Sequence, residues 1–187
     1  MMSTLREYLV QKKAALLARR SAAAEAGHPS MQISARVTAE GRSGVRRIRI
    51  RDHHIISDSP ADFAGYDLGP SSPEIQLGVL GSCLTHIYLI KAAEFDIELD
   101  SLAVGLTARL DPRGGLPEFP DVPVELQDIH YEVQVASPAE DERLEFLKSE
   151  VERVCPVLNP LARPQSITGS VARVDTDRDA DRVPVPA

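Results

Sequence analysis

The sequence is poor in cysteine and aromatic residues, and it contains no tryptophan. Cys83 and Cys155 are the only thiols among 187 residues. Two thiols so far apart form no CxxC pair and exclude a disulfide-rich scaffold. The five histidines show no HxxxH or HExxH spacing, so a structural zinc site is disfavoured as well.

Basic residues are outnumbered by acidic ones, and long apolar runs are scarce. Lys and Arg number 21 against 28 Asp and Glu, which gives a net charge of −7 and disfavours a nucleic-acid partner. The longest uncharged run, Ile75 to Ile90, is short and interrupted by polar residues, whereas a membrane span needs about 20 apolar residues. This run predicts a buried helix. We find no signal-like apolar segment after the N-terminus and expect a cytoplasmic protein without a membrane partner.

What the sequence does have is the composition of a soluble globular domain, with 43% hydrophobic and 26% charged residues. Its length predicts one domain of roughly 150 residues with extensions. We assign residues 1–30 to an N-terminal helical extension, 31–174 to the domain and 175–187 to a flexible acidic, proline-containing tail. Alternating aspartates in the tail do not form a calcium loop, because Ala180 and Pro186 replace the required glycine and glutamate.

Hydrophobic periodicity and turn residues predict the elements within these segments. Residues 3–26 have a helical pattern of apolar and basic positions that ends at Gly27. Ser72 and Pro73 begin a second helix, which runs to about Phe95. The remaining predicted elements are strands over 31–40, 45–51, 54–57, 101–110, 122–136 and 165–174, a hairpin turn over 41–44, loops over 58–72 and 111–121, and a helix from Ser137 to Cys155.

Small residues gather on the central helix just before its cysteine. Gly78, Gly81 and Ser82 precede Cys83. A glycine inside a helix costs about 1 kcal/mol relative to alanine, and close packing would offset that cost. We therefore expect another part of the protein to pack tightly against this stretch.

The two thiols occupy different electrostatic settings. Cys83 lies in the middle of an apolar helix, where the helix dipole has little effect, whereas Cys155 lies at the negative end of its helix, which disfavours a thiolate. A reactive Cys83 therefore needs a nearby cation. His86 follows Cys83 by three residues and shares its helix face, so a Cys–His couple for hydrolysis or acyl transfer is an alternative.

Two parts of the sequence, each around one of the cysteines, carry a resemblance to a known family. The run from Asp67 to Glu74, followed by Leu80-Gly81-Ser82-Cys83-Leu84 and later by the run from Val154 to Asn159, resembles the two signature segments of the OsmC/Ohr family. These are the osmotically inducible and organic hydroperoxide resistance proteins. The resemblance spans residues 31–174. It implies an α+β fold in which antiparallel sheets pack around two long central helices, assembled as an intertwined homodimer.

The resemblance also implies a chemistry and its residues. Cys83 would be the peroxidatic cysteine that attacks an organic hydroperoxide, and Cys155 the resolving cysteine that forms a disulfide with it. Arg42 would lower the pKa of the Cys83 thiol and Glu74 would orient that arginine. A dithiol reductant, of lipoyl type or another thiol, would complete the cycle without any cofactor.

Some assignments stay open at this point. Arg36, Arg46 and Arg51 compete with Arg42 for the role of the activating arginine. Glu74 lies about 180° round an ideal helix from Cys83, so an arginine or the partner subunit must connect the two. A non-catalytic dimeric stress or binding protein on the same scaffold is the alternative to a hydroperoxide reductase.

Overall fold

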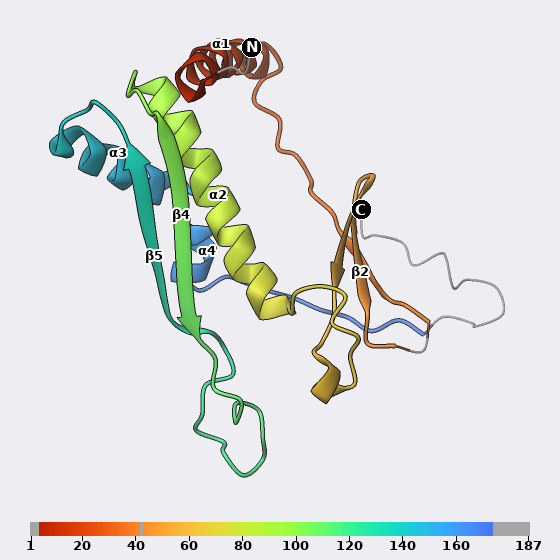
Figure 1. Cartoon of the computed structure of the whole chain (residues 1–187). Coiled ribbons are helices and arrows are strands. Elements are labelled where there is room, and N and C mark those ends of the chain that lie inside the picture. The colour runs from red at the N-terminus through yellow and green to blue at the C-terminus, as the bar shows by residue number, and fades with distance from the viewer. Residues whose placement is uncertain (1–3, 42, 174–187) are drawn as a thin grey trace. The chain divides into compact units, whose positions relative to one another are not determined.

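The computed structural model describes residues 4–41 and 43–173, which fall into two compact units (Figure 1). Among the described residues, the helical unit combines residues 4–29 with 73–163, and the hairpin unit combines residues 30–41 and 43–72 with 164–173. The helical unit is an α+β structure, and the hairpin unit is built on a β-sheet. The two thiols both belong to the helical unit.

The helical unit contains four helices and a two-stranded sheet among its described residues. These elements are α1 (Leu5–Glu25), α2 (Ser72–Glu94), β4 (Ser101–Arg109), β5 (Gln127–Ala136), α3 (Asp141–Val154) and α4 (Leu158–Ala162). Strands β4 and β5 pair antiparallel, with Leu102 opposite Val135 and Leu106 opposite Tyr131. Alternate side chains of this ribbon pack on the core because successive residues of a strand point to opposite faces.

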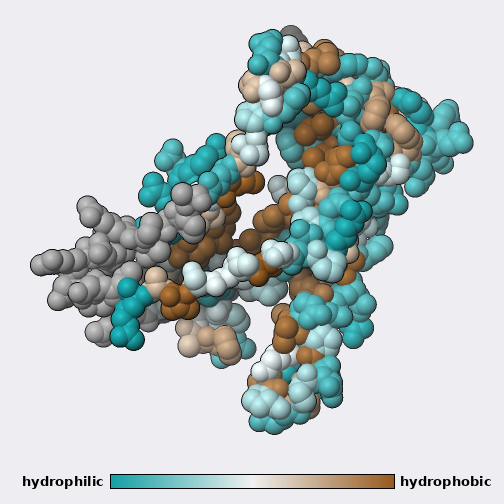
Figure 2. All heavy atoms as spheres, turned by 180° about the vertical axis from the view of Figure 1, so that it is seen from behind, coloured by the Kyte–Doolittle hydropathy of each residue, from teal (hydrophilic) through white to brown (hydrophobic). Residues whose placement is uncertain are grey.

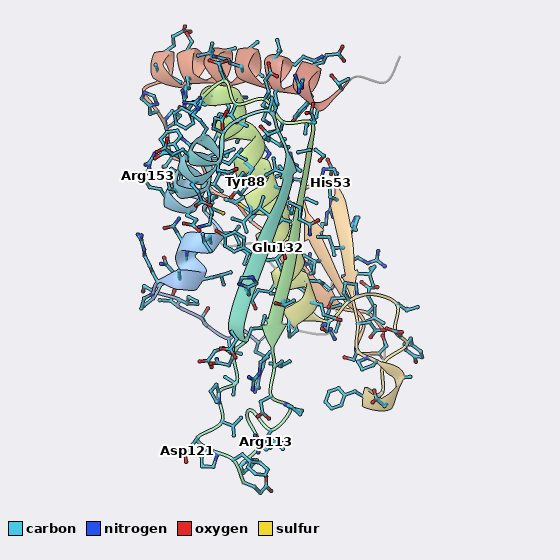
Figure 3. All side chains as sticks on the ribbon, turned by 60° about the vertical axis from the view of Figure 1, so that its left-hand side comes forward. His53, Tyr88, Arg113, Asp121, Glu132 and Arg153 are labelled. Atoms are coloured by element: carbon cyan, nitrogen blue, oxygen red, sulfur yellow. The ribbon has the colours of Figure 1, made fainter. Side chains whose placement is uncertain are left out.

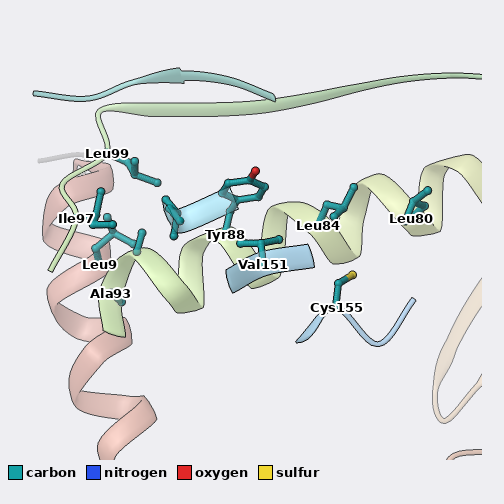
Figure 4. Packing of buried hydrophobic residues seen from close by; sticks show 11 residues of the cluster. Leu9, Leu80, Leu84, Tyr88, Ala93, Ile97, Leu99, Val151 and Cys155 are labelled. Carbon is teal, nitrogen blue, oxygen red and sulfur yellow. The ribbon is translucent and has the colours of Figure 1, made fainter. Parts of the chain in front are cut away.

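The core of the helical unit forms along α2 (Figure 4). Leu80, Leu84 and Tyr88 recur at helical spacing on its buried face, where Leu147 and Val151 of α3 meet them. By length and hydropathy alone α2 could also cross a membrane. Here one face of α2 packs into a folded core, but only 33% of its apolar window is buried, so the predicted helix is confirmed and its burial only in part.

The glycines of α2 differ in what surrounds them. A Cβ atom on Gly81 would lie 2.5 Å from Cδ1 of Leu106, so the close packing expected at this stretch is confirmed there, with β4 as the partner. A Cβ atom on Gly78 would meet nothing within 4 Å. The expected tight contact is therefore wrong for Gly78 within a single chain.

Helix α1 docks on the end of α2 through a regular series of charges. The side chain of Thr4 and the carboxylate of Glu7 form a capping box at its start. Three basic residues at seven-residue spacing then pair with acidic residues between positions 94 and 100: Arg6 with Asp100 and Glu98, Lys13 with Asp96, and Arg20 with Glu94. Leu9 is the buried apolar anchor between them. The structure thus confirms the predicted N-terminal helix.

The hairpin unit is a three-stranded antiparallel sheet followed by a loop. Its strands are β1 (Arg36–Ala39), β2 (Arg46–Ile50) and β3 (His53–Ser57), in that order across the sheet, and a short 3-10 helix, η1 (Ala61–Phe63), follows. Ala39 pairs with Arg46, which confirms the predicted hairpin. The buried carboxylate of Asp58 accepts hydrogen bonds from the backbone N–H groups of Tyr66 and Leu68 and so holds the loop in shape.

Several predicted boundaries are wrong. Strand β1 covers four residues rather than 31–40, and β5 begins at Gln127 rather than at residue 122. Pro120 and Pro123 explain the second difference, because proline lacks the N–H that a strand ladder needs. The whole stretch from Leu110 to Leu126 is a loop, marked by Arg113 and Asp121 in Figure 3.

The C-terminal part of the described chain also differs from the prediction. Helix α3 begins at Asp141 and not at Ser137; the Ser137 hydroxyl donates to the carbonyl of Glu98 and accepts from the N–H of Ala139 in a turn before the helix. Residues 165–173 form no strand, and the short helix α4 was not predicted. The predicted tail, 175–187, lies outside the described residues.

Candidate active site

The two cysteines meet in the helical unit although they are distant in sequence. Cys83 lies midway along α2, and Cys155 is the residue that ends α3. Their Sγ atoms lie 3.5 Å apart, and both are free thiols. Cys155 is buried and Cys83 is partly exposed; Figure 4 shows Cys155 beside α2 near Leu84. A disulfide has an S–S bond of about 2.05 Å, so only a small movement separates this pair from a covalent bond.

The backbone after Cys155 turns so that it faces both sulfur atoms. The N–H of Leu158 donates to the Cys155 sulfur at 3.4 Å, and the N–H of Val157 is close enough to the Cys83 sulfur to lower the pKa of that thiol. Pro156 has no N–H, so these two groups are the first donors that follow Cys155. Hydrogen bonds to sulfur favour the thiolate, and this turn therefore offers one donor to each thiol.

The surroundings of Cys83 oppose ionisation of its thiol more strongly than the Val157 N–H favours it. Burial raises the pKa of the Cys83 thiol to about 11, with further contributions from the hydrogen bond and the charge of Cys155. The Val157 N–H lowers that pKa only in part. Within the described part of a single chain, Cys83 is therefore a protonated thiol at neutral pH.

Tyr131 of β5 packs on the core that contains Cys155, and its hydroxyl is paired with an acidic side chain of α3. The hydroxyl of Tyr131 donates to the carboxylate of Glu152, and Lys148 pairs with the same carboxylate at 3.4 Å. Burial, this hydrogen bond and the nearby charges of Glu152 and Cys155 raise the pKa of Tyr131. The tyrosine hydroxyl therefore stays protonated and acts as a donor, and it brings no positive charge to the thiol pair.

Glu74, a third residue of the predicted site, is not brought to the thiols within the helical unit. Glu74 is an exposed residue in the first turn of α2, nine residues and about 14 Å along the helix axis from Cys83. Arg42 lies outside the described residues. Among its competitors, Arg46 donates to the carbonyl of Asp58 and the hydroxyl of Ser57, so it is committed to holding the strands of the hairpin unit.

His86 does not form the alternative couple with Cys83. Within the described residues no hydrogen bond joins the two side chains, and His86 is exposed. Burial of part of the ring lowers the pKa of His86, and so do the charges of Lys12 and Arg19 on α1. A hydrolase of the Cys–His type thus gains no support from the geometry.

The residues that the sequence analysis missed are those of the turn after Cys155. The side-chain amide of Asn159 donates to the backbone carbonyls of Glu152 and Cys155, at 3.0 and 2.9 Å. An asparagine four residues after a helix-ending cysteine is a signal that could have been recognised, because its side chain can satisfy carbonyls that the helix end leaves unpaired. In the described part of the chain, no group of three His, Cys, Asp or Glu residues is arranged to hold a metal ion.

Comparison with protein families identifies the scaffold. A family model described as OsmC-like protein matches residues 65–169, which is more than half of the chain. This chain belongs to the OsmC-like protein family. The matched segment contains Cys83, Cys155 and Glu74, but it begins after Arg42 and after α1. No curated protein matches the chain.

Solved structures of OsmC-like proteins have a fold similar to that of this chain. An OsmC-like protein from Mycoplasma pneumoniae has a TM-score of 0.62 and 16% identity, over 72% of this chain and 89% of that one. An organic hydroperoxide resistance protein OsmC from Legionella pneumophila, also described as a predicted redox protein, has a TM-score of 0.54 and 13% identity, over 71% and 91%. These likenesses confirm the α+β fold with antiparallel sheets that the sequence predicted.

Proposed function

We propose that this OsmC-like protein reduces organic hydroperoxides with its two cysteines. The observation that carries the proposal is the 3.5 Å separation of the Cys83 and Cys155 sulfur atoms, one partly exposed and the other buried behind it. A partly exposed thiol can meet a substrate, and a buried neighbour can reach only that thiol. The family match and the hydroperoxide resistance described for the Legionella protein support the same activity.

The first step oxidises Cys83 and reduces the peroxide. The Cys83 thiolate attacks one peroxide oxygen, the O–O bond breaks as the S–O bond forms, and the alkoxide leaves and takes up a proton to become an alcohol. The product on the protein is a sulfenic acid. Because the alkyl group would lie against apolar side chains, and burial contributes roughly 0.8 kcal/mol per CH₂, alkyl hydroperoxides should react better than hydrogen peroxide.

The second step forms the disulfide. The Cys155 thiolate attacks the Cys83 sulfur, an S–S bond forms, the S–O bond breaks, and hydroxide leaves as water after protonation. An external dithiol then reduces the disulfide by thiol–disulfide exchange through a mixed disulfide, and is itself oxidised. No cofactor takes part in this cycle.

Mass spectrometry after one equivalent of cumene hydroperoxide tests the proposal. We expect a Cys83–Cys155 disulfide in the wild type. In Cys155→Ser we expect about one turnover and a sulfenic acid on Cys83 that a dimedone-type probe traps, whereas Cys83→Ser should consume no peroxide. Two intact thiols after a moderate excess of peroxide would overturn the proposal.

One observation favours a second candidate, a non-catalytic stress or binding protein on the same scaffold. The burial that raises the pKa of Cys83 to about 11 leaves little thiolate at neutral pH. If Cys83 stays protonated in the complete assembly, the protein would act as a stress or binding protein and would not reduce hydroperoxides. The peroxide experiment separates the two candidates.

A further inference from the structure

Asn159 ties the end of α3 to the turn that follows it. Its side-chain amide bridges the carbonyls of Glu152 and Cys155, and its backbone N–H also donates to the Cys155 carbonyl at 3.1 Å. The last carbonyls of a helix have no partner within the helix. One residue thus makes three hydrogen bonds across the segment that carries Cys155, and it is the only asparagine in the sequence.

The segment held in this way determines where Cys155 and both sulfur donors lie. Cys155 leaves the helix with an extended backbone, at φ −67 and ψ 115, and the chain then reverses into α4. The N–H groups of Val157 and Leu158, which face the two sulfurs, belong to this reversal. A change in its conformation would move the Cys155 sulfur away from Cys83, whereas the acidity of Cys83 depends on the Val157 N–H only in part.

We propose that Asn159 is a positioning residue for the disulfide-forming step. It holds the Cys155 sulfur against Cys83 so that attack on the sulfenic acid is an intramolecular reaction between groups already in place, the situation in which proximity accelerates a reaction most. The inference rests on the proposed function. It adds that formation of the disulfide, and not the reaction of Cys83 with peroxide, depends on this amide.

Asn159→Ala and Asn159→Asp test the proposal. Alanine removes the amide, and aspartate keeps its size but replaces the two N–H donors by an oxygen that repels the carbonyls. Ser149→Ala is the matched control, since the Ser149 hydroxyl also bonds a backbone carbonyl of α3, that of Phe146, but at an exposed position.

Rapid-quench mass spectrometry with tert-butyl hydroperoxide separates the two steps. In the Asn159 variants we expect oxidation of Cys83 within about twofold of the wild-type rate, and closure of the disulfide at least about tenfold slower, with the sulfenic acid trapped by dimedone. Ser149→Ala should match the wild type in both steps. Equal closure rates in the wild type and in a folded Asn159 variant would overturn the proposal.

A measurement without peroxide keeps this test independent of the proposed function. Equilibration with a glutathione buffer reports the stability of the Cys83–Cys155 disulfide, and we expect a tenfold smaller equilibrium constant in Asn159→Ala, or about 30 mV for two electrons. If the wild type ignores peroxide but this difference is found, the proposed function fails and the positioning role stands. An unchanged equilibrium constant overturns the positioning role.

Wild-type protein provides a further readout if both variants fail to fold. Labelling with ¹⁵N-asparagine gives a single side-chain NH₂ pair, that of Asn159. We expect slow hydrogen exchange of these protons and a change in their chemical shift when the disulfide forms. Exchange as fast as that of a free amide would overturn the proposal.

Discussion

The acidity of Cys83 is the main chemical question at the scale of single residues. Burial raises the pKa of this thiol to about 11, and the hydrogen bond and charge of Cys155 raise it as well. A peroxidatic cysteine needs its thiolate, so the proposed activity requires a cation that the described helical unit does not place at Cys83. We propose that Arg42 supplies it in the assembled protein, oriented by Glu74.

Replacement of Arg42 should change the pH dependence of Cys83 alkylation. A nearby guanidinium stabilises the thiolate and lowers the pKa of the thiol, so we expect a wild-type midpoint below the ordinary value of 9.0. Without the cation only burial and Cys155 remain, and the Arg42→Ala midpoint should rise toward 11. The rate of alkylation by iodoacetamide, measured from pH 6 to 11, gives both midpoints.

Arg47→Ala is the control for this measurement. Arg47 belongs to the same hairpin but forms an exposed ion pair with Glu40 at 2.8 Å, so its loss should leave the alkylation profile unchanged. A profile of Arg42→Ala that coincides with that of the wild type would show that Arg42 is not the activating residue. Arg51→Ala would then be the next variant to measure.

The sequence could predict the thiol pair but not its immediate surroundings. Cys83 and Cys155 stand in recognisable segments, and their types and order are sufficient to suggest a common site. The donors from Val157 and Leu158 are backbone groups, so no side-chain pattern reveals them. Their direction depends on the turn after Pro156, which Asn159 holds through contacts that only a folded chain creates.

At the scale of elements, a row of alternating charges joins the three long helices. Glu94 accepts from Arg20 of α1 at 2.6 Å and from Lys91 at 2.9 Å. Lys91 also approaches Glu150 of α3 at 3.7 Å, and Arg153 pairs with Glu150 at 2.7 Å. Lys91 is the buried centre of this row, with 8% of its surface exposed. Figure 3 labels Arg153 at the α3 end.

Lys91→Met should destabilise the helical unit by about 3 kcal/mol, as expected when one partner of a buried ion pair is removed. Burial raises the pKa of Glu94, but hydrogen bonds from Lys91 and Arg20 lower it by more than burial raises it. The net pKa of Glu94 is therefore below its ordinary value of 4.5. The corresponding stability is present above pH 4.5 and is lost as the pH falls through the lower folded pKa. Urea unfolding at several pH values should show that the stability of Lys91→Met depends much less on pH than that of the wild type.

Arg20→Ala serves as the comparison, because it removes an exposed partner of the same carboxylate. Exposed ion pairs contribute well under about 1 kcal/mol, so its effect should be much smaller than that of Lys91→Met. Similar losses for the two variants would mean that burial of Lys91 is not what makes the row important.

The ends of α1 and α2 were easier to predict than those of β1 and β5. The helical patterns of α1 and α2 carry their own start and stop residues, and both helices lie within two residues of their predicted ends. Strand ends depend on where a partner strand stops. Residues 31–35 alternate like a strand, but β1 pairs only over the four residues that face β2.

At the scale of the whole molecule, the two units differ in how much apolar surface they bury. The hydrophobic core cluster lies entirely in the helical unit, and Val45 is the one buried apolar residue among the described residues of the hairpin unit. A three-stranded sheet needs an apolar face packed on something to be stable. Val37, Ile50 and Ile55 remain exposed on its strands, and apolar patches are visible in Figure 2. These features favour the predicted homodimer.

Gly78 gives a second reason to expect a partner chain. Gly81 has its internal explanation in Leu106, whereas Gly78 is exposed on α2 beside Val79, which has 45% of its surface exposed. A glycine there costs about 1 kcal/mol of helix stability relative to alanine. Close approach of a second copy would account for the absence of a side chain at this position.

Gly78→Leu therefore distinguishes a dimer that packs on α2 from a free-standing monomer. In a monomer the new side chain meets open space and improves helix propensity, so the protein should become more stable by up to about 1 kcal/mol. In the dimer that we expect, the side chain blocks close approach, and light scattering should shift from about 41 kDa, twice the chain mass of 20.4 kDa, toward a single chain at micromolar concentration. Gly81→Ala, which must displace Leu106 inside its own chain, should lower the melting temperature in either case. A Gly78→Leu protein of unchanged mass and raised melting temperature would exclude a dimer interface at this face of α2.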